Sequence, residues 1–88
     1  MEHLANAAQP VFTLDIRGYR LDSAIEKLDR QIDRAIMANM QSFEVIHGHG
    51  DGVLKNGVRE KLRRHPAVRG FEFAKPEEGG FGKTVVRL

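Results

Sequence analysis

The spacing of apolar residues changes along the first half of the chain. Residues 11–17 alternate, and one side of the alternation is formed by Phe12, Leu14 and Ile16. A period of two is typical of a β-strand with one buried face. From residue 21 to residue 36, apolar side chains instead recur every three or four positions. This pattern predicts a helix that reaches about residue 39 and packs one side on a sheet.

Two overlapping capping patterns mark the start of this helix. Ser23 is followed three residues later by Glu26, which is the spacing of a capping box, and Asp22 is a competing N-cap. Gly18 ends the preceding strand. We therefore expect the helix to begin directly after one of these two caps.

The second half of the chain predicts three more strands. Residues 43–46 contain three apolar residues and predict a short strand, and residues 68–74 alternate around two phenylalanines. Residues 83–88 are rich in valine and threonine residues, which favour strands. Between the last two strands, residues 75–82 contain three glycines and a proline and predict a loop.

A second helix is predicted for residues 53–64. Its inner face would be formed by Leu54, Val58 and Leu62, and Gly57 is an unfavourable residue inside it. The order of elements is then β-α-β-α-β-β, and a strand-helix-strand unit implies a right-handed crossover between parallel strands. We therefore expect an α+β fold, a two-layer sandwich of a four-stranded mixed sheet with two helices on one face.

The length of 88 residues predicts one small domain, which we place at residues 11–88. Residues 1–10 are polar and alanine-rich, as in a linker or a remnant of cloning. The chain has no cysteine, no apolar run of the roughly 20 residues that a membrane span needs, and no signal-peptide pattern. These features favour a cytoplasmic protein without a membrane partner.

The formal net charge of +2 is small, but the basic residues are clustered. Between residues 55 and 69 there is one acidic residue, Glu60, and the basic ones are Lys55, Arg59, Lys61, Arg63, Arg64 and Arg69. A local basic segment favours an anionic partner such as nucleic acid. It is equally compatible with a helix face that is simply solvated.

Polar side chains follow both strands of the predicted crossover. Asp15 and Arg17 lie at the end of the first strand, and His47 follows the second. Parallel strands joined by a crossover bring their carboxyl ends together, and ligands of open α/β sheets bind at that edge. We therefore expect Asp15, Arg17 and His47 to converge. An exposed ion pair and a histidine bonded to the backbone are the alternatives without function.

A glycine-rich loop follows the second strand and precedes the second helix. Gly48, Gly50 and Gly52 allow positive φ angles and a close approach of the backbone to a ligand. Free N–H groups at the helix start would complete a phosphate site. The spacing matches neither the Walker A motif nor the dinucleotide fingerprint, and a tight strand-to-helix turn is the alternative.

The metal alternatives have few ligands. His47 and His49 flank a glycine, no glutamate or third histidine stands at ligand spacing, and the chain has no cysteine, which argues against structural zinc. For Mg²⁺ or Mn²⁺ the carboxylates would be Asp15 and Asp51. We therefore assign no metal ligands, and keep Mg²⁺ or Mn²⁺ only as a cofactor for cleavage of DNA.

Four segments, in order, resemble the Smr domain, the small MutS-related module that occurs alone and at the C-terminus of bacterial MutS proteins of the second type. They are LDIRG at 14–18, IHGHGDGVLKNGVREKL at 46–62, VRGFEFA at 68–74 and EGGFGKTVVRL at 78–88. The resemblance covers nearly all of residues 12–88. It implies a fold similar to the C-terminal domain of translation initiation factor three, nucleic-acid binding and, in many members, endonuclease activity on DNA or RNA.

The resemblance also places two family motifs, L-D-x-R and H-G-x-G, on residues of this chain. The matching residues are Leu14, Asp15, Arg17, His47, Gly48 and Gly50, with Gly52 as a further usual glycine. Members often have lysine where this chain has His49 and threonine where it has Asp51. Loss of a positive charge and gain of a negative one should weaken phosphate contacts at the loop.

Cleavage of a phosphodiester needs proton transfer and stabilisation of charge on the phosphate oxygens. We expect His47 to act as the general acid or base, Asp15 to orient it or to act as the complementary base, and Arg17 to hold two phosphate oxygens. The residues expected to bind the nucleic-acid backbone are Gly48, His49, Gly50, Gly52, Lys55, Arg59, Arg63 and Lys83.

Three functions remain open from the sequence. The first is an endonuclease, the second a non-catalytic module that docks a larger MutS-like parent on nucleic acid or a ribosome, and the third a protein-interaction domain. RNA carries its own nucleophile in the 2′-hydroxyl group, so acid–base groups suffice to cleave it. DNA needs an activated water, usually bound to a metal. The few metal ligands favour RNA, whereas the MutS-like resemblance favours DNA.

Overall fold

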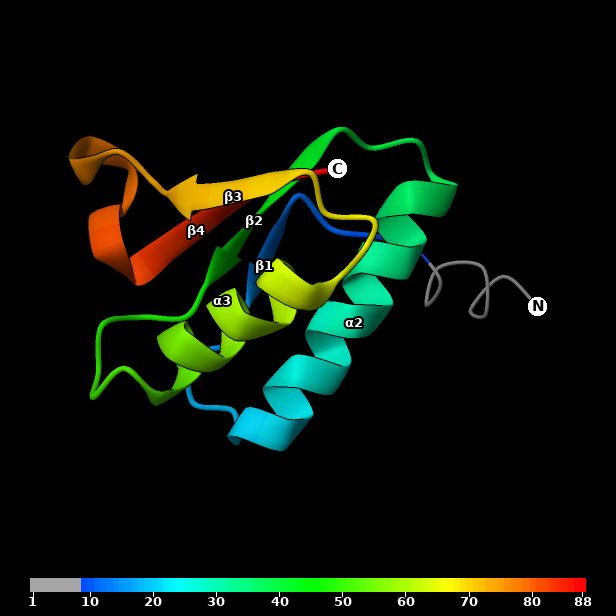
Figure 1. The fold of residues 1–88 in the computed structure, drawn as a ribbon. Helices are drawn as coiled ribbons and strands as arrows, with labels where there is room; N and C mark the ends of the chain where they lie inside the picture. The colour runs from blue at the N-terminus through cyan, green and yellow to red at the C-terminus, as the bar shows by residue number, and fades with distance from the viewer. Residues whose placement is uncertain (1–8) are drawn as a thin grey trace.

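The computed structural model describes residues 9–88 as four strands, two α-helices and two short 3₁₀ helices. In chain order they are β1 (Thr13–Asp15), α2 (Leu21–Met37), β2 (Ser42–Ile46), α3 (Val53–Arg64), β3 (Gly70–Phe73), η1 (Pro76–Glu78), η2 (Gly80–Gly82) and β4 (Lys83–Arg87) (Figure 1). The predicted order of strands and helices is confirmed. Most of the segment predicted as a linker, residues 1–8, lies outside the described residues, so that assignment stays a prediction.

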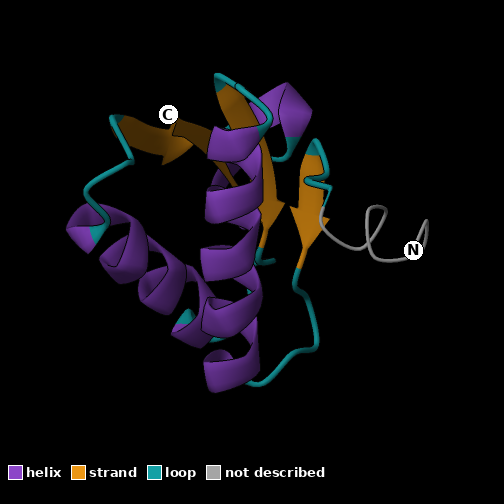
Figure 2. Ribbon diagram, turned by 90° about the vertical axis from the view of Figure 1, so that its right-hand side faces the viewer, coloured by secondary structure: helices purple, strands orange, loops and turns teal. Residues whose placement is uncertain are grey.

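The four strands form one mixed sheet in the order β1-β2-β4-β3. β1 and β2 are parallel, as a crossover through α2 requires, and β4 is antiparallel to both β2 and β3. Both helices cover the same face of the sheet (Figure 2). The predicted two-layer α+β architecture is therefore confirmed. No helix within residues 9–88 combines the length and the apolar composition needed to span a lipid bilayer.

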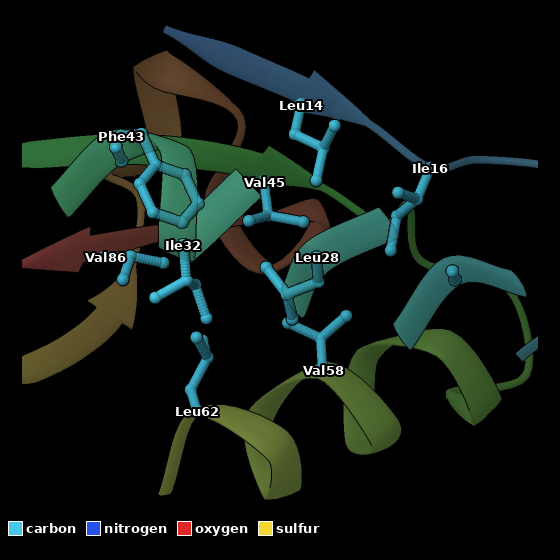
Figure 3. Packing of buried hydrophobic residues seen from close by; sticks show 11 residues of the cluster. Leu14, Ile16, Leu28, Ile32, Phe43, Val45, Val58, Leu62 and Val86 are labelled. Carbon is cyan, nitrogen blue, oxygen red and sulfur yellow. The ribbon is translucent and has the colours of Figure 1, made fainter. Parts of the chain in front are cut away.

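The core lies between the sheet and the two helices (Figure 3). Alternate strand residues point into it from one side, and residues spaced by three or four along the helices meet them from the other. The largest contributors are Leu14, Ile16, Phe43, Val45 and Val86 from the sheet side and Leu28, Ile32, Val58 and Leu62 from the helices. All of these side chains are at most 9% exposed, so the sheet has one buried face and one accessible face.

The prediction for the start of α2 is wrong. The helix begins at Leu21 with Arg20 as N-cap, and no side chain caps it. The first helical bond runs from the Ala24 amide to the Arg20 carbonyl at 2.9 Å. Asp22 therefore lies inside the first turn, where its charge favours the positive end of the helix dipole. The helix ends at Met37, two residues earlier than predicted. Leu21 and Ile36, near its two ends, were expected to be buried but are 40% and 41% exposed.

Gly57 lies inside α3, and replacing it by alanine should stabilise the protein. Alanine favours a helix interior by about 1 kcal/mol over glycine. The new Cβ would lie 2.3 Å from Cδ1 of Leu21, but that side chain is 40% exposed and can rotate away. We expect the free energy of unfolding to rise by about 0.5 kcal/mol in urea denaturation. In a Leu21→Ala background the gain should approach the full value, and a loss of stability there would contradict the explanation.

Candidate nucleic-acid site

One end of the sheet gathers segments that are far apart in sequence. β1 and β2 end side by side there, with Asp15 paired to Ile46. The loop after β2 and the η2 turn meet at the same end (Figure 1), where the amides of His47 and Gly48 both donate to the Gly82 carbonyl at 3.1 and 2.9 Å. The N-terminus of α3 follows this loop directly. The carboxyl ends of the parallel strands thus open onto the glycine-rich segments, as predicted.

Asp15 and Arg17 form a close ion pair on the accessible face of the sheet. Arg17 donates from Nε to Oδ1 of Asp15 at 2.9 Å and from Nη2 to Oδ2 at 2.6 Å. The Arg17 amide donates to Oδ1 as well. These hydrogen bonds, the side-chain ones first, lower the pKa of Asp15 to about 2. Asp15 is therefore a carboxylate at neutral pH and fixes the orientation of the guanidinium.

A cavity of about 360 Å³, here called the Arg17 cavity, opens beside this pair. Its lining residues are Arg17, Ile46, Gly48, His49, Glu78, Gly79, Gly82 and Lys83. Arg17, His49 and Lys83 come from three separate segments and bring two positive charges and an imidazole to one space, and the Glu78 carboxylate also lines it. Such a set suits a phosphate group, to which an arginine can give two hydrogen bonds. Lys83 also contacts the Glu44 carboxylate at 3.3 Å.

His47 does not share this space. Its side chain is only 4% exposed. Nδ1 lies 2.9 Å from the Gly48 carbonyl oxygen, and Nε2 lies 2.8 Å from the Thr84 hydroxyl. A carbonyl only accepts, so Nδ1 carries the proton and Nε2 accepts from Thr84. Burial, reinforced by the nearby positive charges, lowers the pKa of His47, although the bond to Gly48 opposes this. The imidazole is neutral at pH 7.

The predicted convergence therefore holds for the strand ends but not for the side chains. Leu14 pairs with Val45, and both point into the core. Two residues later, Ile16 and His47 point to that same buried face, whereas Asp15 and Arg17 point to the accessible one. The two candidate groups lie on opposite faces of the sheet. Alternation of side chains along β1 predicts that Asp15 and Arg17 share a face, and the same alternation continued from Val45 puts His47 on the buried face.

His49 is the imidazole on the same side as Arg17. It is exposed and lines the Arg17 cavity. Its ring packs against Gly82, where an added Cβ would lie 2.9 Å from Nε2. Glycine at position 82 therefore leaves room for the ring. The sequence predicted for His49 only a contact with the nucleic-acid backbone. The glycines around His49 prevented a prediction of which face of the sheet its side chain lies on.

The glycine loop has the expected positive φ angles, 79° at Gly48 and 90° at Gly52. Gly52 is the N-cap of α3, and as a glycine it has no side chain that could accept a hydrogen bond from the helix amides. The Asp51 carboxylate nevertheless accepts a hydrogen bond from the Val53 amide at 3.1 Å. One of the free N–H groups predicted to bind phosphate is therefore already occupied, and a negative charge stands beside the others.

The three basic residues of α3 that were predicted to bind the nucleic-acid backbone lie in two places. Lys55 and Arg59 lie against the Phe73 ring, with Nζ and Cζ at 5.9 and 4.0 Å from its centre. Arg63 pairs with Glu60 at 2.6 Å on the surface. None of the three lines the Arg17 cavity. Lys83 alone of the predicted backbone-binding lysines and arginines does so.

Metal ligands are scarce at this end of the fold. Within residues 9–88, no group of three or more histidine and acidic side chains is arranged to hold a metal ion. Asp15, one of the two carboxylates considered for Mg²⁺ or Mn²⁺, is engaged by Arg17, and Asp51, the other, is engaged by the Val53 amide. Oxygen ligands for such an ion would therefore have to come largely from water and from a bound phosphate.

The pH dependence of stability should reveal the buried state of His47. Its pKa in the folded chain lies below the ordinary value of 6.5, so the unfolded chain binds the proton more readily. The contribution of neutral His47 to the free energy of unfolding is complete above pH 6.5 and is lost as the pH falls below it. We expect the free energy of unfolding, measured in urea, to fall between pH 7.5 and 5.5, and His47→Asn to flatten the curve. An equal slope in the variant would contradict this assignment.

Comparison with known proteins adds a family to this geometry. A family model described as the Smr domain matches residues 14–88. The chain is 45% identical over 75 residues to a protein of Staphylococcus epidermidis named Endonuclease MutS2, and 44% identical over 75 residues to the Staphylococcus aureus protein of that name. Each match covers 85% of this chain and 10% of the relative. The chain thus spans about a tenth of the length of the curated relatives it matches.

Two solved structures are similar to the fold. The Smr domain of Thermus thermophilus MutS2 superposes with a TM-score of 0.86 at 37% identity, covering 89% of this chain and 98% of that one. YdaL of Escherichia coli, a stand-alone small MutS-related protein, superposes with a TM-score of 0.82 at 20% identity, covering 88% of this chain and 63% of that one. The second likeness is one of fold.

Proposed function

Because the chain belongs to the Smr domain family, we propose that it binds nucleic acid at the Arg17 cavity and cleaves a phosphodiester bond there. The observation that carries the proposal is the meeting of Arg17, His49 and Lys83 around one cavity at the ends of the parallel strands. Relatives named Endonuclease MutS2 support the activity, and the basic and imidazole groups support a phosphate ligand. Activities of a longer parent protein, including docking on a ribosome, remain predictions.

In this proposal Arg17 is the phosphate-binding residue. Asp15 accepts from Nε and Nη2, which leaves donors on Nη1 and Nη2 for two phosphate oxygens. Because Asp15 already fixes the guanidinium, little side-chain freedom is lost when a phosphate binds. Lys83 adds a second positive charge at the same cavity. Charge that develops on the phosphate oxygens during cleavage would thus meet groups that are already in place.

We assign the proton transfer to His49 and a positioning role to His47. His49 is exposed and lines the same cavity as the phosphate-binding arginine, and an imidazole nitrogen can accept or donate a proton. His47 instead holds the loop: its Nδ1 donates to the Gly48 carbonyl, and its Nε2 is fixed by Thr84. The role first expected for His47 would require its ring to leave the core.

A non-catalytic docking module is the second candidate function. It is favoured by the state of Asp15, whose low pKa and pairing with Arg17 make it a poor general base. Binding without turnover needs only the positive charges of the cavity and of α3. Both candidates predict binding that weakens steeply with salt, because phosphate contacts release counterions. A protein-interaction domain predicts no such dependence.

A cleavage assay separates these functions. Labelled single-stranded RNA and supercoiled DNA are incubated with the chain in Mg²⁺, Mn²⁺ or EDTA, and binding is followed in parallel at several salt concentrations. We expect RNA cleavage to persist in EDTA because the 2′-hydroxyl group supplies the nucleophile, and DNA nicking to require added metal. His49→Ala should abolish cleavage and retain binding. Binding without cleavage of either substrate would favour the docking module, and absence of salt-dependent binding would exclude both.

A further inference from the structure

Phe81 is an exposed aromatic residue held in a glycine turn. It lies in η2 between Gly80 and Gly82, and its side chain is 64% exposed. Its ring packs edge-to-face with Phe73, with centroids 4.9 Å apart and an interplanar angle of 81°. A single exposed apolar residue is ordinary in a protein surface. Phe81 differs because a second aromatic ring fixes its orientation while most of its surface stays open.

Positive charges surround this aromatic pair. The Arg59 guanidinium stacks on Phe73 with Cζ 4.0 Å from the ring centre, and Lys55 lies 5.9 Å away. Within residues 9–88, neither cation forms an ion pair with a carboxylate. We call Phe81, Phe73, Lys55 and Arg59 the aromatic–basic surface. Aromatic rings beside unneutralised cations are the usual components of a site for single-stranded nucleic acid.

Phe73 pairs with Thr84, whose hydroxyl contacts His47, so the aromatic–basic surface lies on the helix side of the sheet and meets the Arg17 cavity only at the η2 turn. Gly82 lines the cavity, and Phe81 precedes it in the same turn. The carbonyl of Gly82 accepts from the amides of His47 and Gly48, so the turn is tied to the glycine loop. Phe81 and the cavity are therefore held in one fixed arrangement. On the Phe81 side of the turn, the cations available to the backbone of a bound strand are Lys55 and Arg59.

We propose that Phe81 stacks on an unpaired base and thereby selects single-stranded over duplex nucleic acid. This inference rests on the proposed function and specifies its substrate. In a duplex the base faces are stacked on one another and only base edges are accessible in the grooves. An exposed phenyl ring gains nothing from such edges. Stacking on an unpaired base is tolerant of sequence, because every base has a π-face.

Fluorescence tests the stacking directly, because the chain has no tryptophan. Phe81→Trp places a single indole at the proposed contact, and a stacked base should quench its emission. Titrations use oligouridine, oligodeoxythymidine and a duplex of the same length. Phe12→Trp is the matched control, since Phe12 is 81% exposed but precedes β1 at the opposite end from Asp15. We expect quenching by the single strands in Phe81→Trp only, and equal quenching in both variants would overturn the proposal.

Affinity supplies the second measurement. Phe81→Ala should weaken binding of the single strands by roughly 5- to 150-fold and leave duplex binding almost unchanged. Phe81→Tyr should retain the binding, and Phe12→Ala should behave like the parent chain. If Phe81→Ala and the unsubstituted chain bind single strands equally, the inference is wrong and the proposed function still stands. If the unsubstituted chain binds no nucleic acid, both the inference and the proposed function are wrong. The two single strands separate RNA from DNA as the source of the base.

Discussion

Replacing Arg17 by alanine is expected to reduce phosphodiester cleavage by about 10²–10³-fold while the fold remains intact. This is the usual loss when one preorganised group that stabilises transition-state charge is removed. Arg17 is 60% exposed and pairs with Asp15 on the accessible face, so the core is untouched. The measurement is single-turnover cleavage with enzyme in excess, combined with thermal unfolding. The cleavage rate of Arg17→Lys should lie between those of Arg17→Ala and the unsubstituted chain, because lysine retains the charge but cannot donate two parallel hydrogen bonds.

A matched control is available three residues along the chain. Arg20 is also exposed and also faces a carboxylate, Asp22, at 3.7 Å, but it does not line the Arg17 cavity. Arg20→Ala removes the same charge and should leave cleavage and its salt dependence nearly unchanged. Equal losses in the two arginine variants would mean that overall charge matters and the cavity does not. Full activity in Arg17→Ala would remove the basis of the proposed site.

His47→Ala should be the most destabilising change at this end of the fold, by about 2–4 kcal/mol. The side chain is 4% exposed and makes two hydrogen bonds, to Gly48 and to Thr84. Its removal leaves a small cavity and deprives the Thr84 hydroxyl, which is fully buried, of its partner. A loss of this size is a large part of the 5–15 kcal/mol that is typical of small domains. Urea denaturation at pH 7.5 measures it.

The two histidines of the loop should show opposite behaviour. His49→Ala removes an exposed side chain and should change stability by less than about 0.5 kcal/mol. Its expected loss is in cleavage, under conditions where the chain remains folded. Stability that is insensitive to His47→Ala would contradict its buried role. If His49→Ala leaves cleavage unchanged, His49 is not the proton-transfer group, and His47 and Asp15 become the candidates again.

Sequence patterns predicted the architecture well because it depends on burial. Alternation in β1 and the spacing of three or four in the helices reflect which side chains leave water, and that is what the fold satisfies. The start of α2 was missed because the chain leaves the Gly18 turn directly into the helix, with its backbone carbonyl at Arg20 accepting the first bond. A side-chain cap is favourable, but a helix does not require one.

The sequence predicted most of the residues that meet at the candidate site, but not how their side chains are arranged there. The ends of the parallel strands followed from topology, and the facing of His47 would have followed from counting two residues on from Val45. The role of Asp51 at the start of α3 was also accessible, since aspartate commonly accepts hydrogen bonds from helix N-termini. The contact of Phe81 with Phe73 was not accessible, because it depends on how the η1–η2 segment folds back across the end of the sheet.

The carbonyl of Gly82 accepts two amides, those of His47 and Gly48, and so fills both of its lone pairs. The wall that carries Phe81 and the wall that carries His49 therefore cannot shift independently. Displacement of the η2 turn would break both bonds and open both amides to solvent. Hydrogen exchange at the amides of His47 and Gly48 therefore reports on the position of the turn, and a ligand that holds the turn in place would slow exchange at both.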